Sequence, residues 1–237
     1  MLVMILYTVL TVHLGCVLAS LYMHRYVIHR QYTMNPKAEA TMKVLYWLLF
    51  DTVSSAFVVQ HRKHHALSDS YNDPHSPRFG LWNLLRNCLI PGFFRSYKIE
   101  ISSADYLYYG VSPAVKTSFI DRNPRLGVLF LLTFNIIVFG WYGVAIWLIQ
   151  LFAINFFTIT TITVFGHWIG YRNYDLKDLT RNMMPIGILS IGEELHNNHH
   201  NDSRLPNYAV KANEFDLGYF YLRVLNRFNL IQLNKRA

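Results

Sequence analysis

Residues 126–165 read LGVLFLLTFNIIVFGWYGVAIWLIQLFAINFFTITTITVF, a stretch of forty positions without a formal charge. An α-helix rises about 1.5 Å per residue, so about 20 apolar residues cross the ~30 Å hydrocarbon core of a bilayer. The stretch therefore predicts two membrane-spanning helices, at about 126–140 and 143–165. Gly-Trp-Tyr-Gly at 140–143 predicts the tight turn between them, because aromatic side chains suit the membrane interface.

Two further apolar stretches precede this pair. Residues 2–22 have spanning length and lack the basic region and cleavage site of a signal peptide, so they predict a retained helix. Residues 44–59 are shorter and contain Asp51, Ser54 and Ser55, which predicts a half-buried or re-entrant helical segment. The chain is 52% hydrophobic, 16% aromatic and only 15% charged, a composition typical of an all-α integral membrane protein.

The basic residues predict the topology. All of them lie in 24–125 and 172–237, which the positive-inside rule places on the cytoplasmic face, with the N-terminus on the far side. We therefore expect one domain, 1–237, whose cytoplasmic helical cap comprises 61–125 and 167–237. Within this cap, Leu81–Tyr97 mixes apolar residues with two arginines and predicts an amphipathic helix lying in the interface.

Nine of the 11 histidines occur in groups that follow apolar segments or lie near the C-terminus. They are His24 and His29; His61, His64 and His65; His167; and His196, His199 and His200. Both triplets have the i, i+3, i+4 spacing that places side chains on one helix face. His24 and His29 are separated by about 140° on an α-helix. Either the helix loosens there or these two histidines serve different metals.

The number of imidazoles predicts a metal centre. Imidazole binds iron, copper, nickel and zinc, and nine ligands exceed the coordination of a single ion. We therefore expect two ions with four or five nitrogens each. Cysteine ligands, usual in structural zinc sites, are missing, which favours redox iron at a membrane edge open to oxygen. Acceptors for the remaining ring N–H groups are expected among the acidic residues Asp69, Asp73, Asp175, Glu193 and Glu194.

The two remaining histidines are predicted to have other roles. His13 lies in the middle of the first apolar helix, roughly 16 Å from His24, too far to share a metal with it. We expect His13 to serve helix packing or to line a tunnel. His75 is expected to be a turn residue or a substrate contact. No nucleic-acid partner is expected.

Three motifs resemble the histidine boxes of the membrane fatty acid desaturases, in particular the acyl-CoA, delta-9-like branch. They are HRYVIHR at 24–30, HRKHH at 61–65 and HNNHH at 196–200. The flanking sequences DPH at 73–75, GYRNYD at 170–175, GEE at 192–194 and EFD at 214–216 are also similar to that branch. The resemblance covers roughly residues 20–235.

The resemblance implies a membrane-embedded helical fold with a cytoplasmic cap, a di-iron site and a narrow acyl tunnel. The enzyme would use O2 and two electrons to introduce a cis double bond into a saturated acyl chain. The two Fe2+ ions would be bound by His24, His29, His61, His64, His65, His167, His196, His199 and His200. The electron donor would be a separate protein such as a ferredoxin or a b-type cytochrome, and the membrane would be the bacterial inner membrane or the endoplasmic reticulum.

The substrate contacts that the resemblance suggests lie in two places. Thr8 and Val12 of the first helix would close the end of the tunnel. A phosphate or thioester head group would contact Arg62, Lys63, His75, Arg172 or Arg204. Val59 and Gln60 stand where animal acyl-CoA members have charged residues that contact the carrier. The acyl chain can therefore be linked to coenzyme A, to a carrier protein or to a lipid.

Other features depart from the family. Thr163 stands four residues before His167, where the family has an asparagine that reaches one iron through water. Only 23 residues precede His24, which predicts a minimal form or a chain truncated at its start. The alternatives are a related di-iron hydroxylase or carotenoid-type oxygenase, a catalytically silent metal-binding membrane protein, and a metal transporter. A transporter would place its polar ligands at the bilayer midplane, unlike these histidines.

Overall fold

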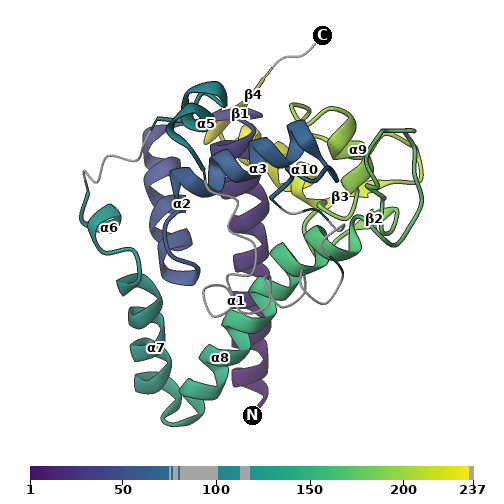
Figure 1. Cartoon of the computed structure of the whole chain (residues 1–237). Coiled ribbons are helices and arrows are strands. Elements are labelled where there is room, and N and C mark those ends of the chain that lie inside the picture. The colour runs from purple at the N-terminus through teal and green to yellow at the C-terminus, as the bar shows by residue number, and fades with distance from the viewer. Residues whose placement is uncertain (75, 77–79, 81–100, 113–117, 235–237) are drawn as a thin grey trace.

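The computed structural model describes residues 1–74, 76, 80, 101–112 and 118–234 of a mostly helical chain (Figure 1). Its first element is α1 (Leu2–Leu18), which continues directly into the π-helix η1 (Ala19–Ile28). Together they form an apolar helix of 27 residues. The predicted amphipathic helix Leu81–Tyr97 lies outside the described residues.

A helical hairpin packs beside this first helix. It comprises α7 (Leu126–Phe139) and α8 (Tyr142–Asn155), and α8 continues into the π-helix η3 (Phe156–Phe165). Gly140 has a φ of 60°, a left-handed conformation that favours glycine, so the turn falls within the predicted Gly-Trp-Tyr-Gly sequence. The helices Leu2–Ile28 and Tyr142–Phe165 are long and apolar enough to cross a membrane, and α7 is apolar but shorter.

Buried polar side chains hold these helices in register. The Tyr7 hydroxyl donates to Oδ1 of Asn135 at 2.7 Å, and Nδ2 of Asn135 donates to Oε1 of Gln150 at 2.9 Å. Nε2 of Gln150 then donates to the Thr11 hydroxyl at 2.6 Å. Because Asn135 and Gln150 are fully buried, these bonds satisfy groups that would be costly to leave unpaired, and they fix the arrangement of α1, α7 and α8.

The predicted half-buried segment 44–59 is divided between two helices. Helix α2 (Pro36–Leu49) ends just before Asp51, which has a φ of 149°. Helix α3 (Ser55–Leu67) then begins at the N-cap Ser54, whose side chain accepts from the Phe57 N–H at 3.1 Å. The break redirects the chain, so the second histidine motif lies on a helix of its own rather than at the end of an apolar one.

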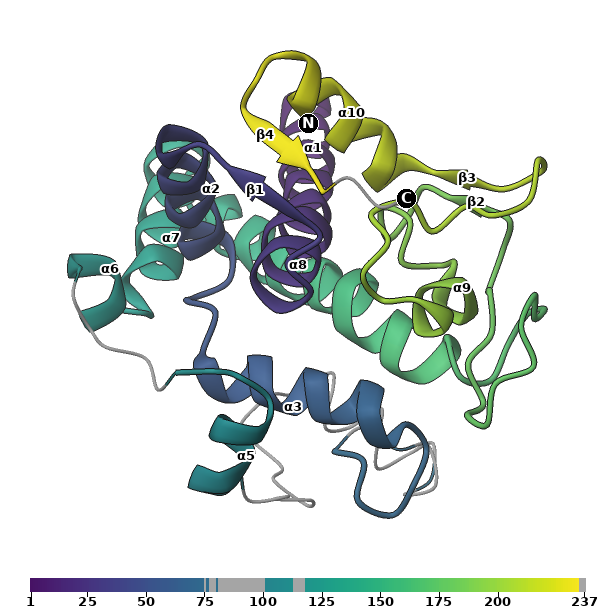
Figure 2. The ribbon, with the colours of Figure 1, turned by 90° about the horizontal axis from the view of Figure 1, so that it is seen from above.

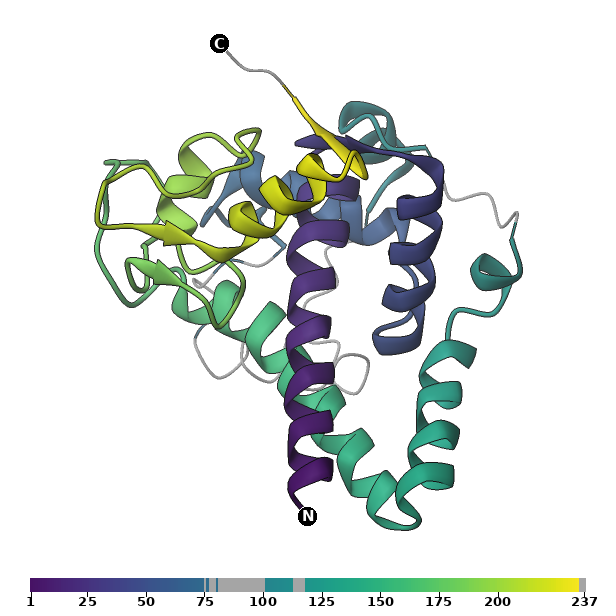
Figure 3. The same ribbon diagram turned by 180° about the vertical axis from the view of Figure 1, so that it is seen from behind.

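The C-terminal part of the chain covers the upper end of the first helix with short elements. They are β2 (Ile186–Gly187), α9 (His196–Asn201), β3 (Phe215–Asp216), α10 (Leu217–Arg227) and β4 (Ile231–Leu233). Strand β4 pairs antiparallel with β1 (Tyr32–Met34), and β2 pairs parallel with β3. Seen from behind, α10 crosses the upper part of the first helix (Figure 3).

Two apolar cores lie on either side of η1. One joins Met23 to Tyr46 of α2 and Val58 of α3, and the other joins Leu21 to Leu222 of α10 and Ile231 of β4. Seen from above, α3 and α9 flank the end of the α8–η3 helix (Figure 2). Two short helices complete the described structure, α5 (Ser103–Tyr108) and α6 (Phe119–Arg122). This packing brings the three histidine motifs and the end of η3 to one place.

Candidate metal centre

The structure gathers the nine histidines into two adjacent groups. The five-histidine group comprises His24, His29, His61, His65 and His199, and the four-histidine group comprises His64, His167, His196 and His200. Within each group, one ring nitrogen of every histidine lies within 4.8 Å of those of the others. The described residues thus present five and four nitrogens, the division that the sequence predicted for two ions.

A π-helix explains how His24 and His29 reach the same group. In η1 the backbone N–H of His29 bonds to the carbonyl of His24, five residues earlier, at 3.0 Å. This wider turn replaces the 3.6-residue turn of an α-helix and aligns residues five apart. The two rings accordingly lie 4.6 Å apart between centroids. Of the two alternatives posed by the sequence, the helix loosens, and both histidines belong to one group.

Each histidine triplet is divided between the two groups, which corrects the prediction that a triplet points in one direction. His61 and His65 of α3 face the five-histidine group, whereas His64 faces the other. In the C-terminal motif His199 faces the five-histidine group, whereas His196 and His200 face the other. Neighbouring positions on a helix differ by about 100°, so one short helix serves both groups where they meet.

In the described part of the chain, carboxylates hold the second ring nitrogen of His24, His64, His167 and His200. Nδ1 of His24 lies 2.8 Å from Glu193, that of His64 2.9 Å from Asp73, that of His167 3.1 Å from Asp69, and that of His200 3.1 Å from Asp178. A carboxylate can only accept, so Nδ1 carries the proton and Nε2 is left with a free lone pair. Each of these bonds therefore turns a lone pair toward its group.

Three of these carboxylates were expected from sequence, and one was not. Asp69, Asp73 and Glu193 hold histidines, whereas the Asp175 side chain is fully exposed. Asp178 takes the expected place of Asp175, and no spacing rule in the sequence distinguishes the two. Glu194 has a different role, because it accepts the backbone N–H groups of Ser190 and Gly192 at 2.7 and 3.1 Å and shapes the turn before α9.

The electrostatics of the groups favour neutral imidazoles. Burial lowers the pKa of several histidines well below 6.5, and the neighbouring histidines lower it further; they are His29, His65, His196, His199 and His200. Burial alone would raise the pKa of Glu193, but His24 and then Arg25 and Ser20 lower it overall. Neutral imidazole is the protonation state that binds metal, and these five histidines favour it.

The arrangement of ring nitrogens fits bound cations. Nε2 atoms of paired histidines approach one another at 3.0 to 3.2 Å, as in His24–His61, His65–His199 and His167–His196. In addition, Nε2 of His200 is buried without a hydrogen-bond partner in the described structure. Converging lone pairs repel one another, and a buried unpaired nitrogen is costly, but a cation between them removes both penalties. A donor set of imidazoles alone suits iron, copper, nickel or zinc.

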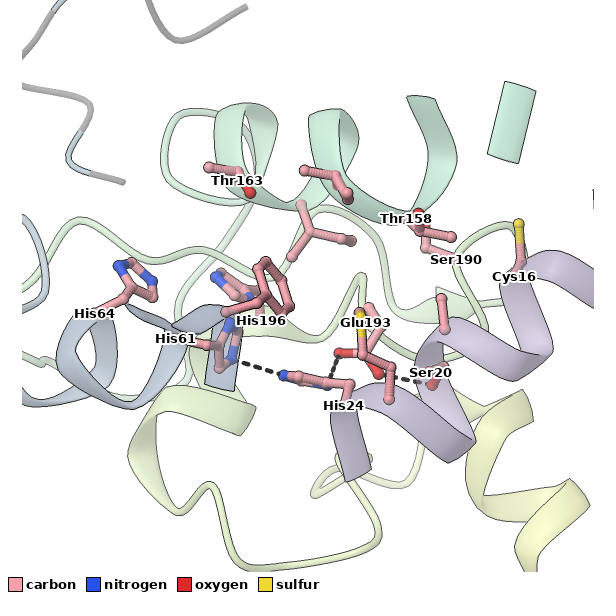
Figure 4. A pocket seen from close by; sticks show the side chains of 15 residues that line it. Cys16, Ser20, His24, His61, His64, Thr158, Thr163, Ser190, Glu193 and His196 are labelled. Atoms are coloured by element: carbon pink, nitrogen blue, oxygen red, sulfur yellow. Dashed lines mark hydrogen bonds and ion pairs between the residues drawn. The ribbon is translucent and has the colours of Figure 1, made fainter. Parts of the chain in front are cut away.

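An apolar pocket lies against both groups (Figure 4). One wall is formed by Cys16, Ala19 and Met23 of the first helix, and the opposite wall includes Thr158 and Ile162 of η3. The histidines His24, His61, His64 and His196 also line it, together with Phe57 and Thr163. An extended hydrocarbon chain in this pocket would therefore pass beside both histidine groups.

The first helix and α8 approach closely just beyond Cys16. Gly15 packs against Ile154, and a Cβ atom at position 15 would lie 2.7 Å from the Ile154 side chain. Thr8 and Val12, predicted to close a tunnel, do not line the pocket: the Thr8 hydroxyl bonds to the Met4 carbonyl, and Val12 packs against both apolar cores.

The predicted head-group residues lie apart from the apolar pocket. Lys63 pairs with Asp105 at 3.1 Å, and the exposed Arg204 pairs with Asp202 at 3.1 Å. Arg172 donates to the Leu176 carbonyl at 2.7 Å. Arg62 donates to the carbonyls of Ile28 and Tyr109, at 2.7 and 2.8 Å. His75 lies outside the described residues.

His13 has a packing partner. Its Nε2 lies 3.0 Å from the Tyr221 hydroxyl of α10. This contact joins α1 to α10. It fits the helix-packing role, one of the two roles that the sequence left open for His13; the other was to line a tunnel.

Sequence reasoning assigned no role to Arg25, which is completely buried. Its guanidinium donates to both carboxylate oxygens of Asp216, at 3.1 and 3.0 Å, and to the Pro206 carbonyl at 2.6 Å. It also lies 3.9 Å from the centre of the Tyr208 ring. Arg25 thereby ties the first histidine motif to the segment that follows the third. The signal that could have found this pairing is that Arg25 and Asp216 both belong to the quoted motifs, HRYVIHR at 24–30 and EFD at 214–216.

Comparisons with known proteins agree with this architecture. The chain is 28% identical over 234 residues to the hex-5-enoyl-[acyl-carrier protein] acetylenase of Moorena producens (strain JHB), covering 90% of this chain and 70% of that protein. It is 28% identical over 218 residues to the acyl-CoA C20 Delta5-desaturase of Anemone leveillei, covering 89% and 67%. It is 26% identical over 210 residues to the sn-1 stearoyl-lipid 9-desaturase of Anabaena variabilis, covering 87% and 74%.

The chain thus spans roughly two thirds to three quarters of the length of these relatives. The sequence pattern that describes fatty acid desaturases matches residues 1–214, which include all three histidine motifs and both histidine groups. The chain therefore belongs to the fatty acid desaturase family.

Proposed function

We propose that this protein is a fatty acyl desaturase that introduces a cis double bond into a saturated acyl chain at a di-iron centre. One observation carries the proposal: two groups of histidines, with five and four converging ring nitrogens, border the same apolar pocket. Two redox metal ions beside an apolar pocket would suit the stepwise removal of hydrogen from two adjacent methylenes of an acyl chain.

The residues that would hold each iron follow from the groups. One Fe2+ would bind His24, His29, His61, His65 and His199, and the other would bind His64, His167, His196 and His200. With iron bound, the centre would supply the oxidising chemistry of R–CH2–CH2–R′ + O2 + 2e⁻ + 2H⁺ → R–CH=CH–R′ + 2H2O. The four carboxylates would fix the ring orientations, so that little reorganisation accompanies the reaction.

The apolar pocket would hold and orient the substrate. Its walls of Cys16, Met23 and Ile162 are apolar, so an acyl tail would displace water from the space beside the histidines. The relatives' names refer to substrates linked to acyl-carrier protein, to coenzyme A and to lipid, and the acyl chain is the part that these three substrates share. Thr163 lines this pocket close to the four-histidine group, where it would influence the second iron.

We further propose that Leu2–Ile28 and the α7–α8–η3 hairpin cross the membrane. Large apolar side chains such as Val9, Ile137 and Phe152 are exposed along these helices, as a lipid-facing surface would be. The histidine groups lie at the opposite end of the first helix from the N-terminus (Figure 1). The positive-inside rule puts that end on the cytoplasmic face of a bacterial inner membrane or of the endoplasmic reticulum.

The deciding experiment is the fatty acid profile of a host that expresses the chain, by gas chromatography of methyl esters with double-bond location. A new cis-monounsaturated acid that is absent with the His199→Ala variant would support the proposal. A hydroxylated product would identify an oxygenase on the same centre instead. The absence of a new product from protein with two bound irons, supplied with a reductase system, would overturn the acyl desaturase assignment in favour of a non-acyl substrate or a silent metal protein.

A further inference from the structure

Helix α10 carries more apolar surface than the rest of the described chain covers. One side of the helix packs against the first helix through Tyr221 and Leu222. Next to this side runs a row of apolar side chains that are 39% to 69% exposed, which we call the apolar strip; it consists of Phe220, Val224 and Phe228. A contiguous apolar strip, unlike scattered single residues, indicates a surface that another molecule covers.

Two contacts of α10 show which way the apolar strip faces. Gly218 lies against the upper part of the first helix, because a Cβ atom there would approach the Arg25 guanidinium to 2.8 Å. Tyr221 reaches in the opposite direction, to His13. At about 100° per residue, Tyr221 is turned about 60° from Gly218, and Val224 a further 60° in the same sense. The strip therefore faces the N-terminal half of the first helix, which lies below α10 in Figure 3.

That half of the first helix is uncovered on the side that carries α10. Leu6 and Leu10 precede His13 by seven and three residues, so they lie on the same helix face, and both are exposed. About 20 helical residues cross the ~30 Å hydrocarbon core of a bilayer. A core that begins at the N-terminal end of this helix therefore ends about one turn before Arg25. Helix α10 lies between the levels of His13 and Arg25, at that boundary.

The outer edge of the apolar strip is basic. Arg223 and Arg227 are exposed, stand one turn apart and flank the strip on the side away from the first helix. Neither is paired with a carboxylate in the described part of the chain, and residues 217–237 contain no Asp or Glu. Arginine side chains can lay their apolar stems along such a strip while their guanidinium groups reach the level of the phosphates.

We propose that α10 lies in the surface of the cytoplasmic leaflet, with its apolar strip among the acyl chains and with Arg223 and Arg227 bound to the phosphates of anionic phospholipids. The inference rests on the proposed membrane crossing of Leu2–Ile28 and not on the chemistry of the metal centre. An anionic bilayer surface matches both features of α10, because it offers hydrocarbon to the strip and phosphate to the arginines. A second copy of this chain, in a two-fold contact, would instead bring like charges to the same edge.

The lipid contact bears on the metal centre through the N-cap of α10. Asp216 accepts from the Tyr219 N–H at 2.9 Å and is paired with Arg25, the neighbour of His24 in the chain. A helix that is fixed in the leaflet surface therefore sets the height of the first histidine motif above the membrane.

Spin labels test the position of α10. Val224→Cys places a label on the apolar strip, and Asn226→Cys is the matched control, an exposed position on the same helix about 160° away. Leu10→Cys provides a reference on the exposed face of the first helix. The variants carry Cys88→Ser, and the labelled background protein reports any reaction at the buried Cys16. Each full-length chain is reconstituted in nanodiscs of phosphatidylcholine mixed with phosphatidylglycerol.

We expect the label at Val224 to collide with O2, which concentrates in lipid, more than with a water-soluble nickel complex, as the label at Leu10 does. The label at Asn226 should show the reverse preference. If the label at Val224 meets the nickel complex as readily as that at Asn226, the strip faces water and the inference is overturned. If it meets neither reagent, a protein surface covers the strip, which overturns the inference in favour of a second copy. A label at Leu10 that meets the nickel complex would overturn the proposed membrane crossing itself, a result separate from the readings on α10.

Lipid binding tests the two arginines. Native mass spectrometry of the detergent-solubilised chain, titrated with phosphatidylglycerol or with phosphatidylcholine, measures the dissociation constant of each lipid. We expect Arg223→Gln combined with Arg227→Gln to weaken phosphatidylglycerol binding about 30-fold and to leave phosphatidylcholine binding unchanged. The matched control is Lys177→Gln combined with Lys211→Gln, which removes two exposed charges outside α10. Equal effects of the two double variants, or a wild type that binds both lipids alike, would overturn the contact between these arginines and anionic lipid.

Discussion

Nδ1 of His24 lies 2.8 Å from a carboxylate oxygen of Glu193, and the other oxygen of Glu193 accepts from the Ser20 hydroxyl at 2.7 Å. The carboxylate thus fixes the His24 ring with its Nε2 toward His61. We predict that Glu193→Gln weakens iron binding about 10- to 100-fold, because an amide holds the same volume but cannot stabilise the donated proton as an anion does. Iron retained after dialysis against graded chelator measures the effect.

The matched control for Glu193→Gln is Asp175→Asn. Asp175 is a carboxylate that the sequence also predicted to hold a histidine, but its side chain is fully exposed in the structure. Its substitution should therefore leave iron retention unchanged. Equal retention in both variants would show that Glu193 does not orient a ligand.

The two neighbouring histidines of the second motif should affect different irons. We predict that His64→Ala perturbs the four-histidine group and His65→Ala the five-histidine group, because the rings face opposite groups. Both variants, and His199→Ala, should lose turnover and still insert into membranes. Mössbauer spectra of ⁵⁷Fe-loaded protein should show a different iron signal lost in each case. Loss of the same signal from His64→Ala and His65→Ala would contradict the five-plus-four division.

Arg25 and Asp216 form a buried ion pair that joins η1 to β3. Removing one partner leaves an unpaired buried charge, so we predict that Arg25→Met lowers the free energy of unfolding by about 3–5 kcal/mol. Adding Asp216→Leu should then cost less than the same change costs in the wild type, since the ion pair is already lost and the remaining cost is that of the N-cap bond to the Tyr219 N–H at 2.9 Å. Thermal unfolding in detergent compares the variants. If the double variant loses more free energy of unfolding than the two single variants lose together, Arg25 and Asp216 are not directly paired.

The iron-free protein should lose stability in acid. The buried histidines His29, His65, His199 and others have pKa values below the 6.5 of the unfolded chain, so below pH 6.5 the unfolded state takes up more protons. Each such histidine lowers the free energy of unfolding by about 1.4 kcal/mol for every pH unit between 6.5 and its pKa in the folded protein. We predict that the melting temperature is flat above pH 7 and falls below about 6.5, and that iron moves the fall to lower pH. A flat profile to pH 5 would contradict this account.

The contact between Gly15 and Ile154 should limit the depth of the apolar pocket. We predict that Ile154→Ala extends the pocket past Cys16 and shifts the product profile toward longer acyl chains. The variant should also lose about 2–5 kcal/mol of stability, because Ile154 is buried. Leu148→Ala, at an exposed position on the same helix, is the control. An unchanged chain-length profile in a folded Ile154→Ala protein would place the pocket's end elsewhere.

The sequence by itself determined the features that depend on local composition and spacing. The uncharged stretch 126–165 identified the helical hairpin, because helix length and hydrophobicity are read from consecutive residues. The sequence Gly-Trp-Tyr-Gly at 140–143 located its turn, where Gly140 adopts a positive φ that costs glycine little. The nine candidate histidines were read from their motifs, and the expectation of two ions with four or five nitrogens each followed from the chemistry of imidazole.

Only the tertiary structure decided which histidine group each of those residues joins. The widening of η1 that aligns His24 with His29 and the division of each triplet between two groups arise where α3, η1, η3 and α9 meet. The choice of Asp178 over Asp175 and the pairing of Arg25 with Asp216 join residues that are distant in sequence or indistinguishable by type. Local sequence patterns show which side chains share a helix face. Contacts between distant segments determine which histidine, carboxylate or arginine each of those side chains pairs with.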